Sequence, residues 1–445
     1  MNVVHLSTYH RFGGAAVAAN RLHRALLSSN RSNGSRSNDS VESTMLVGTS
    51  NRQETHQPEP GVTYLANNFL AEQTAFGRFV AERLYFLPVE RDRSVRFQFS
   101  PAVFGANLTF HPAIQQADVL HLHWINFGFL SIDTLRSLFA LGKPIVWTLH
   151  DQWAFTGGCH YSRGCNRFLS HCQSCPYLKT PGERDLSYRI FEQKIRLFET
   201  ANILFTPPSR WLADEAMRSA LLRRFPFVVI PYAIDQRVFC PIDRAEANTF
   251  LDLPGTDHPD VGLPHHPARL LFGSANVTDT RKGFRYFADA LTLLHQQHPN
   301  LTPEILIFGK GRSYLFDELP YPIRQLGILT ADDEIVATYN AADAMVVPSL
   351  EDNLPNTVIE SLACGTPVVA FRTGGIPEMI DHRQNGYLAA VGSAQELADG
   401  LAFILTHPNP GELRQNARQS AETRFSEAVV VRQHVDLYKQ LLIGL

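Results

Sequence analysis

Strand-like and helix-like patterns alternate along nearly the whole chain, and this alternation limits the folds that the sequence can adopt. Residues 3–7 form a short apolar run typical of a buried strand, and residues 15–27 follow with apolar side chains at helical spacing. Similar pairs recur later, such as the apolar run at 344–348 and the helical pattern at 357–363. Short apolar runs at 227–230 and 328–329 also predict strands, and after the strand predicted at 367–371 only helical patterns follow. Repeated units of this kind predict parallel sheets covered by helices, which is the doubly wound α/β class.

The chain has 445 residues, which is too long for one ordinary hydrophobic core and favours two or three domains. A proline-containing segment at 231–241 separates two α/β halves of comparable size, so we predict the linker there. We expect a first domain over residues 1–235 and a second over 236–425. The last helical pattern, 426–445, is expected to return to the first domain. Residues 30–43 have almost no apolar side chains and are predicted to form a surface loop.

The composition is that of a globular protein without an obvious polyanionic partner. Hydrophobic residues make up 44% of the chain and charged residues 19%, and the net charge of −3 argues against nucleic-acid binding. No apolar run approaches the roughly 18–20 residues that cross a bilayer, and the N-terminus lacks the pattern of a signal peptide. We therefore expect a cytoplasmic protein, in which the six cysteines are thiols or metal ligands before they are disulfides.

Ligands of parallel α/β sheets bind beyond the carboxyl ends of the strands, so polar residues at those ends are candidates for a site. In the first half, Gly13 and Gly14 precede a helix and would let backbone N–H groups approach a phosphate. Two further strands end in polar side chains that could meet at one sheet edge, namely His121, His123, Trp124, Asn126, His150 and Asp151. A histidine followed by an aspartate could act as an acid or base or could hydrogen-bond sugar hydroxyls, and the sequence leaves both roles open.

The strongest candidate site is the segment 348–369, PSLEDNLPNTVIESLACGTPVV. Asp352 follows a strand, Glu360 lies in the next helix, and the turn at 353–357 should present backbone N–H groups to an anion. A rise of ~1.5 Å per residue puts the two carboxylates on the order of 10 Å apart, which suits the two ends of a ligand that contains a diphosphate. Lys282, before another helix, would add a positive charge. Two solvated surface carboxylates and a basic loop are the alternative interpretation.

The segment 344–370 resembles the E-x7-E region of family 4 of the retaining GT-B glycosyltransferases, many of which build bacterial polysaccharides and lipid-linked glycans. Supporting similarities lie at residues 13–14, 119–123, 145–151, 230–239, 272–283, 308–311 and 374–378. The resemblance implies the GT-B fold, with two Rossmann-like domains facing across a cleft. It also implies transfer of a sugar from a nucleoside diphosphate sugar to a glycan or lipid-linked acceptor. Retention in this family is thought to need no established protein nucleophile, and catalysis is expected to need no cofactor.

The same resemblance assigns roles to single residues. Glu360 would bind the nucleotide ribose, Asp352 would lie near the transferred sugar, and Lys282 would neutralise the leaving diphosphate. His150 would line the cleft close to the reacting carbon. Further donor contacts are expected from Gly13, Gly14, Asn276, Arg281, Gly309, Asn353, Leu354, Pro355, Asn356 and Thr357, and the acceptor cleft from His121, His123, Asn126 and Asp151.

Two positions depart from the family's pattern. The first acidic residue of E-x7-E is Asp352 here, so the pattern is D-x7-E, and Glu351 is out of register by one. Either the shorter side chain serves the sugar, or a shifted loop brings Glu351 into its place. The basic residue that many members have six positions before Lys282 is Asn276 here, and Arg281 is the expected replacement.

Four of the six cysteines lie close together, at Cys159, Cys165, Cys172 and Cys175, within a predicted insert at 156–178. The C-x2-C half suits a structural zinc ion, because a tight turn can hold two thiolates on one metal. The other pair is more widely spaced, so buried thiols or a disulfide are the alternatives. One subgroup of the family resembles this chain in having such a cluster, and we expect it to shape the acceptor wall. Cys240 and Cys364 are predicted to be packing thiols.

Residues 64–89 combine many aromatic and aliphatic side chains with two arginines. Such a stretch could touch a membrane that bears a lipid-linked acceptor, although a helix packed on its own domain is the commoner explanation. Two other functions stay open at this point: a nucleotide-sugar epimerase of the same architecture, and a non-catalytic module that binds sugar nucleotides. An epimerase would need a second acid/base set that cannot be assigned here. The presence of Lys282, Glu360 and His150 argues against a non-catalytic module.

Overall fold

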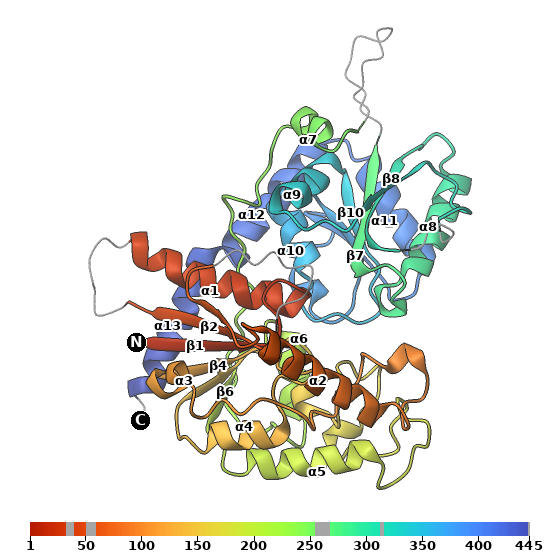
Figure 1. The fold of residues 1–445 in the computed structure, drawn as a ribbon. Coiled ribbons are helices and arrows are strands. Elements are labelled where there is room, and N and C mark those ends of the chain that lie inside the picture. Colours follow the sequence, from red (N-terminus) through yellow and green to blue (C-terminus); the bar gives the residue numbers. More distant parts are fainter. Residues whose placement is uncertain (33–39, 50–58, 254–267, 312–315, 444–445) are drawn as a thin grey trace. The chain divides into compact units, whose positions relative to one another are not determined.

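The computed structural model describes residues 1–32, 40–49, 59–253, 268–311 and 316–443 (Figure 1). Its contacts divide the chain into two compact units. Unit 1 consists of Met1–Ala233 and Val430–Leu445, and unit 2 consists of Ile234–Val429. The chain therefore passes from one unit to the other twice, and its last helix ends in unit 1. Most of the predicted loop at 30–43 lies outside the described residues.

Unit 1 is built on a parallel six-stranded sheet in the order β3-β2-β1-β4-β5-β6. This is the order of a Rossmann sheet, in which the first and fourth strands are central. The strands are β1 (Asn2–Ser7), β2 (Glu42–Val47), β3 (Val62–Tyr64), β4 (Val119–Leu122), β5 (Ile145–Trp147) and β6 (Ile203–Phe205).

The helices of unit 1 cover both faces of this sheet. They are α1 (Gly14–Ser32), α2 (Phe69–Phe86), α3 (Pro112–Gln116), α4 (Ile132–Phe139), α5 (Leu186–Phe198), α6 (Arg210–Arg218) and most of α13 (Glu427–Ile443). Side-chain caps fix several helix starts, since Ser131, Asp185 and Ser209 accept backbone N–H groups at α4, α5 and α6.

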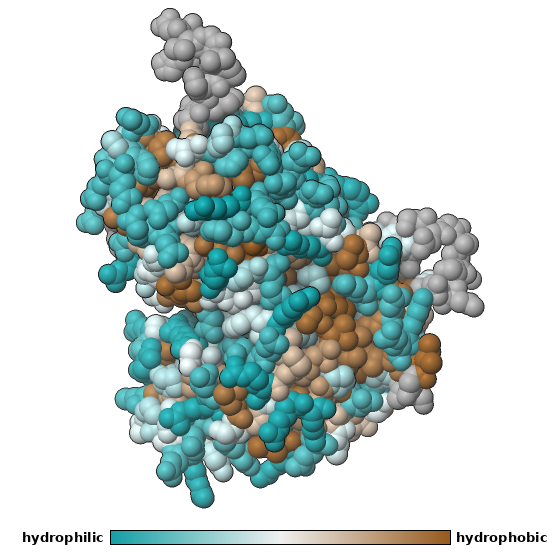
Figure 2. Space-filling model, turned by 180° about the vertical axis from the view of Figure 1, so that it is seen from behind, coloured by the Kyte–Doolittle hydropathy of each residue, from teal (hydrophilic) through white to brown (hydrophobic). Residues whose placement is uncertain are grey.

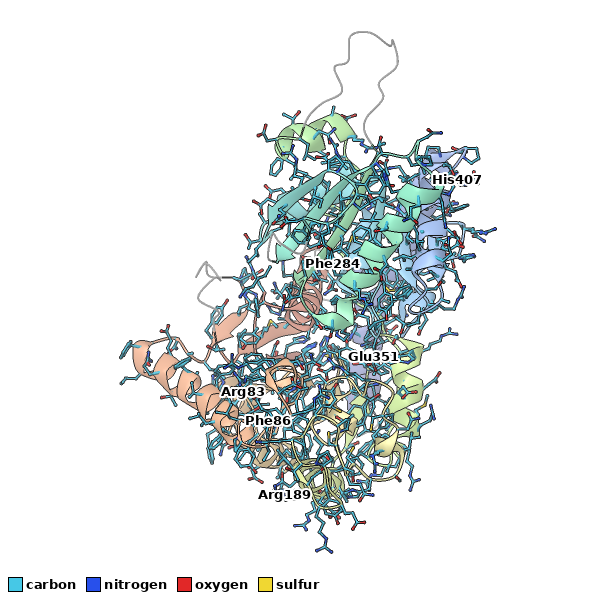
Figure 3. All side chains as sticks on the ribbon, turned by 90° about the vertical axis from the view of Figure 1, so that its right-hand side faces the viewer. Arg83, Phe86, Arg189, Phe284, Glu351 and His407 are labelled. Atoms are coloured by element: carbon cyan, nitrogen blue, oxygen red, sulfur yellow. The ribbon has the colours of Figure 1, made fainter. Side chains whose placement is uncertain are left out.

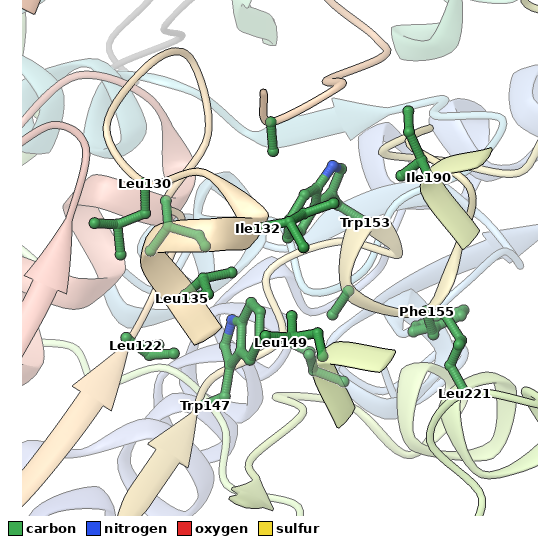
Figure 4. Packing of buried hydrophobic residues seen from close by; sticks show 14 of the residues in the cluster. Leu122, Leu130, Ile132, Leu135, Trp147, Leu149, Trp153, Phe155, Ile190 and Leu221 are labelled. Carbon is green, nitrogen blue, oxygen red and sulfur yellow. The ribbon is translucent and has the colours of Figure 1, made fainter. Parts of the chain in front are cut away.

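Alternating strand residues divide the core of unit 1 between the two faces of its sheet. On one face Leu120, Ile145 and Trp147 pack with α4 and α5 in a large aromatic and aliphatic cluster (Figure 4). On the other face Val3 and Val119 pack with α1 and α13. The period-2 alternation of a strand explains this division, because neighbouring side chains point to opposite faces.

Helix α2 is buried on one side and exposes apolar groups on the other. It places Phe86 in the core, where its ring stacks on Phe99 with centroids 4.8 Å apart (Figure 3). Phe69, Leu70 and Phe76 remain 71%, 75% and 61% exposed. The packing explanation for residues 64–89 therefore holds for only one side of the helix, and the membrane contact stays a prediction. None of the described helices is long and apolar enough to span a bilayer. On the face drawn in Figure 2, most surface residues are hydrophilic and the hydrophobic ones form smaller patches.

Unit 2 repeats the same architecture, with a parallel sheet in the order β12-β11-β10-β7-β8-β9. Its strands are β7 (Arg269–Asn276), β8 (Glu304–Lys310), β9 (Ile323–Gly327), β10 (Ala344–Val347), β11 (Val368–Phe371) and β12 (Gly386–Ala389). Its helices are α7 (Arg244–Phe250), α8 (Phe284–Gln297), α9 (Asp332–Ala341), α10 (Asn356–Ala363), α11 (Ala394–Leu405) and α12 (Pro410–Phe425). The two sheets confirm the predicted doubly wound α/β class.

Several details of the strand prediction were wrong. The strand expected at 328–329 lies earlier, at β9, which is an edge strand with a mixed polar sequence. The run at 227–230 forms only an isolated bridge, between Phe205 and Phe227. A further strand, β12, follows β11 where only helices were expected.

Tyr438 connects α13 to the sheet of unit 1 through a polar contact in an apolar layer. The side chain is fully buried, and its hydroxyl lies 2.7 Å from His121 Nδ1. Tyr438→Phe leaves that nitrogen without this partner, so it should lower the free energy of unfolding of unit 1 by about 1–3 kcal/mol. Tyr438→Ala also opens a cavity and should cost about 3–5 kcal/mol.

Urea unfolding followed by tryptophan fluorescence measures this directly, because all four tryptophans lie in unit 1. Tyr85→Ala, at a side chain that is 40% exposed on α2, is the control and should change little. Equal stability of Tyr438→Ala and the wild type would contradict this account of α13.

Candidate functional site

Loops at the carboxyl ends of four neighbouring strands of unit 2, β7, β8, β10 and β11, are joined by close backbone contacts. Leu350 N donates to Arg281 O at 2.8 Å, and Gly375 N donates to Asp352 O at 3.2 Å. Three glycines with positive φ allow this approach, since an added Cβ would lie within 2 Å of a neighbouring carbonyl oxygen: Gly283 against Pro348, Gly309 against Ser274 and Gly374 against Asp352. The loops therefore form one tightly connected edge, the place where parallel α/β sheets bind ligands.

Asp352 is the centre of a charged cluster on this edge. Lys282 Nζ lies 2.6 Å from Asp352 Oδ2, and Arg281 Nη1 lies 3.3 Å from the same oxygen. The Ser349 hydroxyl also donates to it, at 3.2 Å. Asp352 is buried, which raises its pKa, but the charges of Lys282 and Arg281 outweigh burial and hold the pKa at about 2. Burial lowers the pKa of Lys282, while Asp352 opposes that shift.

The structure selects between the two acids that the sequence left as alternatives. Glu351 is partly exposed and uses its backbone carbonyl to accept from Arg281 Nη1 at 2.8 Å (Figure 3). The side chain that meets the two cations is that of Asp352. The loop therefore keeps the D-x7-E register, and no shift of Glu351 into the cluster is needed.

Helix α10 joins this cluster to the second acid of the pattern. Its capping position is Pro355, which provides no side-chain cap, so the positive end of the helix is left for an anion. Glu360, further along α10, is buried and accepts from the Tyr339 hydroxyl at 2.9 Å. Asn353 and Leu354 are buried in the loop before the helix.

The other predicted donor residues lie in different places. Gly309 is in β8 against the loop after β7. Asn276 is exposed, and its side-chain oxygen accepts from Thr278 within its own loop, so it does not replace the missing basic residue. Gly13 and Gly14 follow β1 in unit 1, at the start of α1.

Two of the residues predicted to line the cleft, His150 and His123, belong to a chain of hydrogen-bonded rings in unit 1. Tyr232 Oη lies 2.9 Å from His150 Nδ1, His150 Nε2 lies 3.2 Å from His123 Nδ1, and His123 Nε2 lies 3.0 Å from His5 Nδ1. His121 is bonded separately, to Tyr438 and Thr148. Burial lowers the pKa of His150 to about 4 and lowers those of the other three rings well below their usual value. At neutral pH the rings are therefore neutral.

Asp151 does not pair with His150. Its carboxylate accepts from His160 Nδ1 at 2.6 Å and from Trp124 Nε1 at 2.9 Å. Burial raises the pKa of Asp151, but its contacts with His160 outweigh burial and lower it. Asn126 and Asp151 line one small cavity together with His123 and His150. The sequence missed Tyr232, His5 and His160 as members of this network.

Two groups in unit 1 have metal-binding residue types. Among the described residues, potential ligand atoms lie within 4.8 Å of one another in one trio, that of His5, His121 and His123. Nitrogen atoms of these rings already take part in hydrogen bonds, between His5 and His123 and from His121 to Tyr438 and Thr148. The four cysteines of the insert line a second cavity as free thiols. No three of their sulfur atoms lie within 4.8 Å of one another.

Comparison with known proteins supports the assignment of unit 2. Residues 267–407 match the family model described as glycosyl transferases group 1. A putative colanic acid biosynthesis glycosyl transferase, WcaC of Escherichia coli, is 24% identical over 343 residues, which are 75% of this chain and 78% of that protein. A D-inositol 3-phosphate glycosyltransferase of Pseudarthrobacter chlorophenolicus is 30% identical over 303 residues, 65% of this chain and 63% of that protein.

Solved structures share the whole fold. Sucrose-phosphate synthase from Thermosynechococcus elongatus superposes with a TM-score of 0.65 at 17% identity, and the match covers 100% of both chains. Anabaena Alr3699/HepE, solved in complex with UDP-glucose, gives a TM-score of 0.59 at 17% identity, again over 100% of both chains. These similarities show that the two Rossmann-like units together form the GT-B fold.

The histidine network of unit 1 predicts a loss of stability in mild acid. Unfolded histidines have a pKa of about 6.5. Burial lowers the folded pKa to about 4 for His150 and for His434, a buried residue of α13 whose ring centroid lies 5.7 Å from that of His121. The unfolded state therefore binds more protons below pH 6.5, and stability is lost as pH falls from 6.5 towards 4. Each such histidine contributes about 1.4 kcal/mol per pH unit in that window.

Urea unfolding by tryptophan fluorescence between pH 7.5 and about 5 measures the slope, which His434→Leu should reduce by about 1.4 kcal/mol per pH unit. Val435→Leu, on the same helix, should leave the slope unchanged. Stability that is independent of pH across this window would show that the rings are not held neutral.

Proposed function

We propose that this chain, a glycosyltransferase with the GT-B fold, transfers a sugar from a nucleoside diphosphate sugar to a glycan or lipid-linked acceptor. The observation that supports the donor class best is the contact of Lys282 and Arg281 with Asp352 beside the uncapped start of α10. Two cations and a helix N-terminus on one sheet edge suit a diphosphate. No metal ion is required in this proposal, because these groups supply the positive charge.

Lys282 and Arg281 are proposed to hold the diphosphate and to stabilise it as the leaving group. Negative charge grows on the diphosphate as the bond to the sugar breaks, so cations fixed at that position lower the barrier. Asp352 holds Lys282 when no donor is present, and a phosphate oxygen can take over part of that contact. Asp352 then lies beside the transferred sugar.

Glu360 is proposed to bind the ribose hydroxyls of the nucleotide. It lies eight positions after Asp352, on the helix whose N-terminus faces the phosphates. A carboxylate accepts from two neighbouring hydroxyls, and the bond from the Tyr339 hydroxyl keeps it oriented. Diphosphate and ribose thus lie along α10 in the order that a nucleotide requires.

His150 is proposed to position the sugar as a neutral hydrogen-bonding group. Both of its ring nitrogens have protein partners, and its pKa of about 4 leaves it unprotonated at neutral pH. It is therefore unsuited to act as a general acid. We expect transfer with retention, as in the family that the chain resembles. The relatives named for colanic acid and for D-inositol 3-phosphate support a saccharide or polyol acceptor.

Incubation with a panel of nucleotide sugars, with UDP-glucose included, tests the reaction class. A transferase without acceptor slowly releases the nucleoside diphosphate and free sugar, and the anomer released first reports retention or inversion. Lys282→Met should slow this hydrolysis by on the order of 10²-fold. Arg285→Met, at a side chain that is 89% exposed on α8, is the control. Recovery of an altered but intact nucleotide sugar would favour an epimerase, and no binding of any donor would contradict both enzymes.

Calorimetric titration with UDP tests the ribose assignment. Glu360→Ala removes charge-assisted hydrogen bonds worth about 1.5–3 kcal/mol, so the Kd for UDP should rise by roughly 10- to 150-fold. Glu351→Ala is the control, because its carboxylate is not the one that meets the cations. Unchanged affinity in Glu360→Ala would place the ribose elsewhere, and a larger effect in Glu351→Ala would reverse the register.

A further inference from the structure

The stretch between β5 and α5 is long, irregular and buried. From the end of β5 at Trp147 to the start of α5 at Leu186, all of it described, it contains only the short 3-10 turns η2 (Trp153–Phe155) and η3 (Arg167–Leu169). Irregular segments of this length are uncommon inside compact domains. Yet Phe155, Phe168 and Tyr177 belong to the main core of unit 1. Its strand-like pairing is limited to the isolated bridges Phe99–Cys159 and Glu90–Leu178, so side-chain contacts hold most of the segment in place.

Four cysteines of this segment line a single cavity: Cys159, Cys165, Cys172 and Cys175. Three of them are less than 10% exposed, and Cys165 is partly exposed. None is in a disulfide. A cavity lined by four thiols offers the ligand set of a structural zinc site.

Backbone N–H groups already point at two of the sulfurs. Gly157 N donates to Cys172 Sγ at 3.2 Å, and the backbone N–H of Tyr177 donates to Cys175. Such bonds stabilise a thiolate more than a neutral thiol, because the acceptor is then charged. No side chain fits at Gly157, where an added Cβ would lie 2.8 Å from the Cys172 Cβ.

Lys194 of α5 brings a fully buried ammonium group next to the same cavity. Its Nζ donates to the carbonyl oxygens of Trp153 and Thr156 and lies 3.6 Å from the centre of the Trp153 ring. Burial lowers the pKa of Lys194 to about 7, and the nearby Cys172 and Cys159 are the groups that oppose this shift most strongly. A buried charge is costly unless an opposite charge accompanies it. Four neutral thiols offer none, whereas four thiolates around a divalent cation carry a net charge of −2.

We propose that this cavity binds one zinc ion through the thiolates of Cys159, Cys165, Cys172 and Cys175, with Lys194 as the buried counter-charge. Binding releases the four thiol protons to solvent and involves no change of oxidation state. No three of the four sulfurs lie within 4.8 Å of one another, so binding requires the sulfurs to move together. Cys165 can supply that movement, since it is partly exposed and follows two residues with positive φ, Arg163 and Gly164.

The site is structural, and its effect reaches the sheet edge through His160. This residue follows Cys159 directly, bonds Asp151 at 2.6 Å and bonds the Ser100 hydroxyl at 2.9 Å. Its carbonyl also accepts from Gln152 N at 2.9 Å. Fixing Cys159 on a metal therefore fixes the residue that holds Asp151. The proposal does not depend on the donor site of unit 2.

Elemental analysis of protein purified without a polyhistidine tag tests the proposal. We expect about one zinc ion per chain, lost in Cys159→Ser and Cys172→Ser and kept in the control variants Cys240→Ser and Cys364→Ser. Cobalt in place of zinc should give the intense thiolate-to-metal absorption of a tetrahedral thiolate site. Metal-free protein with six titratable thiols in denaturant would overturn the proposal, and so would an intact mass lowered by 2 or 4 Da, which indicates disulfides.

Chelation of the wild type keeps the test valid if the serine variants do not fold. Removing the metal should expose residues 148–185 to limited proteolysis and lower the Tm of unit 1, and added zinc should reverse both changes. UDP binding by unit 2 should survive chelation, which separates this proposal from the proposed function.

Lys194→Met should weaken zinc binding in competition with a chromophoric chelator by about 10-fold or more, whereas Lys179→Met, at an exposed position, should not. Equal affinity in the two variants would remove Lys194 as the counter-charge.

Discussion

The contact between Lys282 and Asp352 connects the fold of unit 2 to its chemistry. Asp352 is buried and Lys282 is partly buried, so removing either side chain leaves the other without its nearest opposite charge. Lys282 follows β7 and Asp352 follows β10, and these strands are neighbours in the sheet. The pair therefore requires the loops to approach closely, and the glycines at 283, 309 and 374 permit that approach. A phosphate that took the place of Asp352 beside Lys282 would therefore meet loops that are already in position.

The sheet edge of unit 1 differs from that of unit 2, because it buries polar rings that carry no charge. Four rings, Tyr232, His150, His123 and His5, bond one another in a chain. Each neutral imidazole has one donor and one acceptor, so such a chain satisfies its inner nitrogens without any ion. Asp151, the carboxylate that follows His150, has its own partners in His160 and Trp124. A neutral, rigid edge suits the positioning of hydroxyl groups better than proton transfer.

Much of the architecture could be predicted from the sequence, because central parallel strands are short apolar runs. β1, β4, β5 and β10 were found in that way, and the linker falls at the division between the units, Ala233 and Ile234. The pattern failed where burial is incomplete or the run is short. β3 has three partly exposed residues, β9 is an edge strand, and β12 begins at a glycine, so none shows a clear apolar run. β2 was missed because it follows directly on a polar stretch, and its first two residues were placed in the predicted loop.

The residues of the candidate site also differ in whether nearby sequence is enough to predict them. Asp352, Glu360 and Lys282 could be named from motif spacing, since each lies within a few residues of a strand end or helix start. The choice of Asp352 over Glu351 could not be predicted from the sequence, because it depends on which side chain faces cations seventy positions away. His160, Tyr232 and Lys194 were missed for the same reason: their roles come from partners that only the fold brings near. Lys194 is the clearest case, since a lysine on an amphipathic helix is normally solvated, and only the fold shows that its side chain is completely buried.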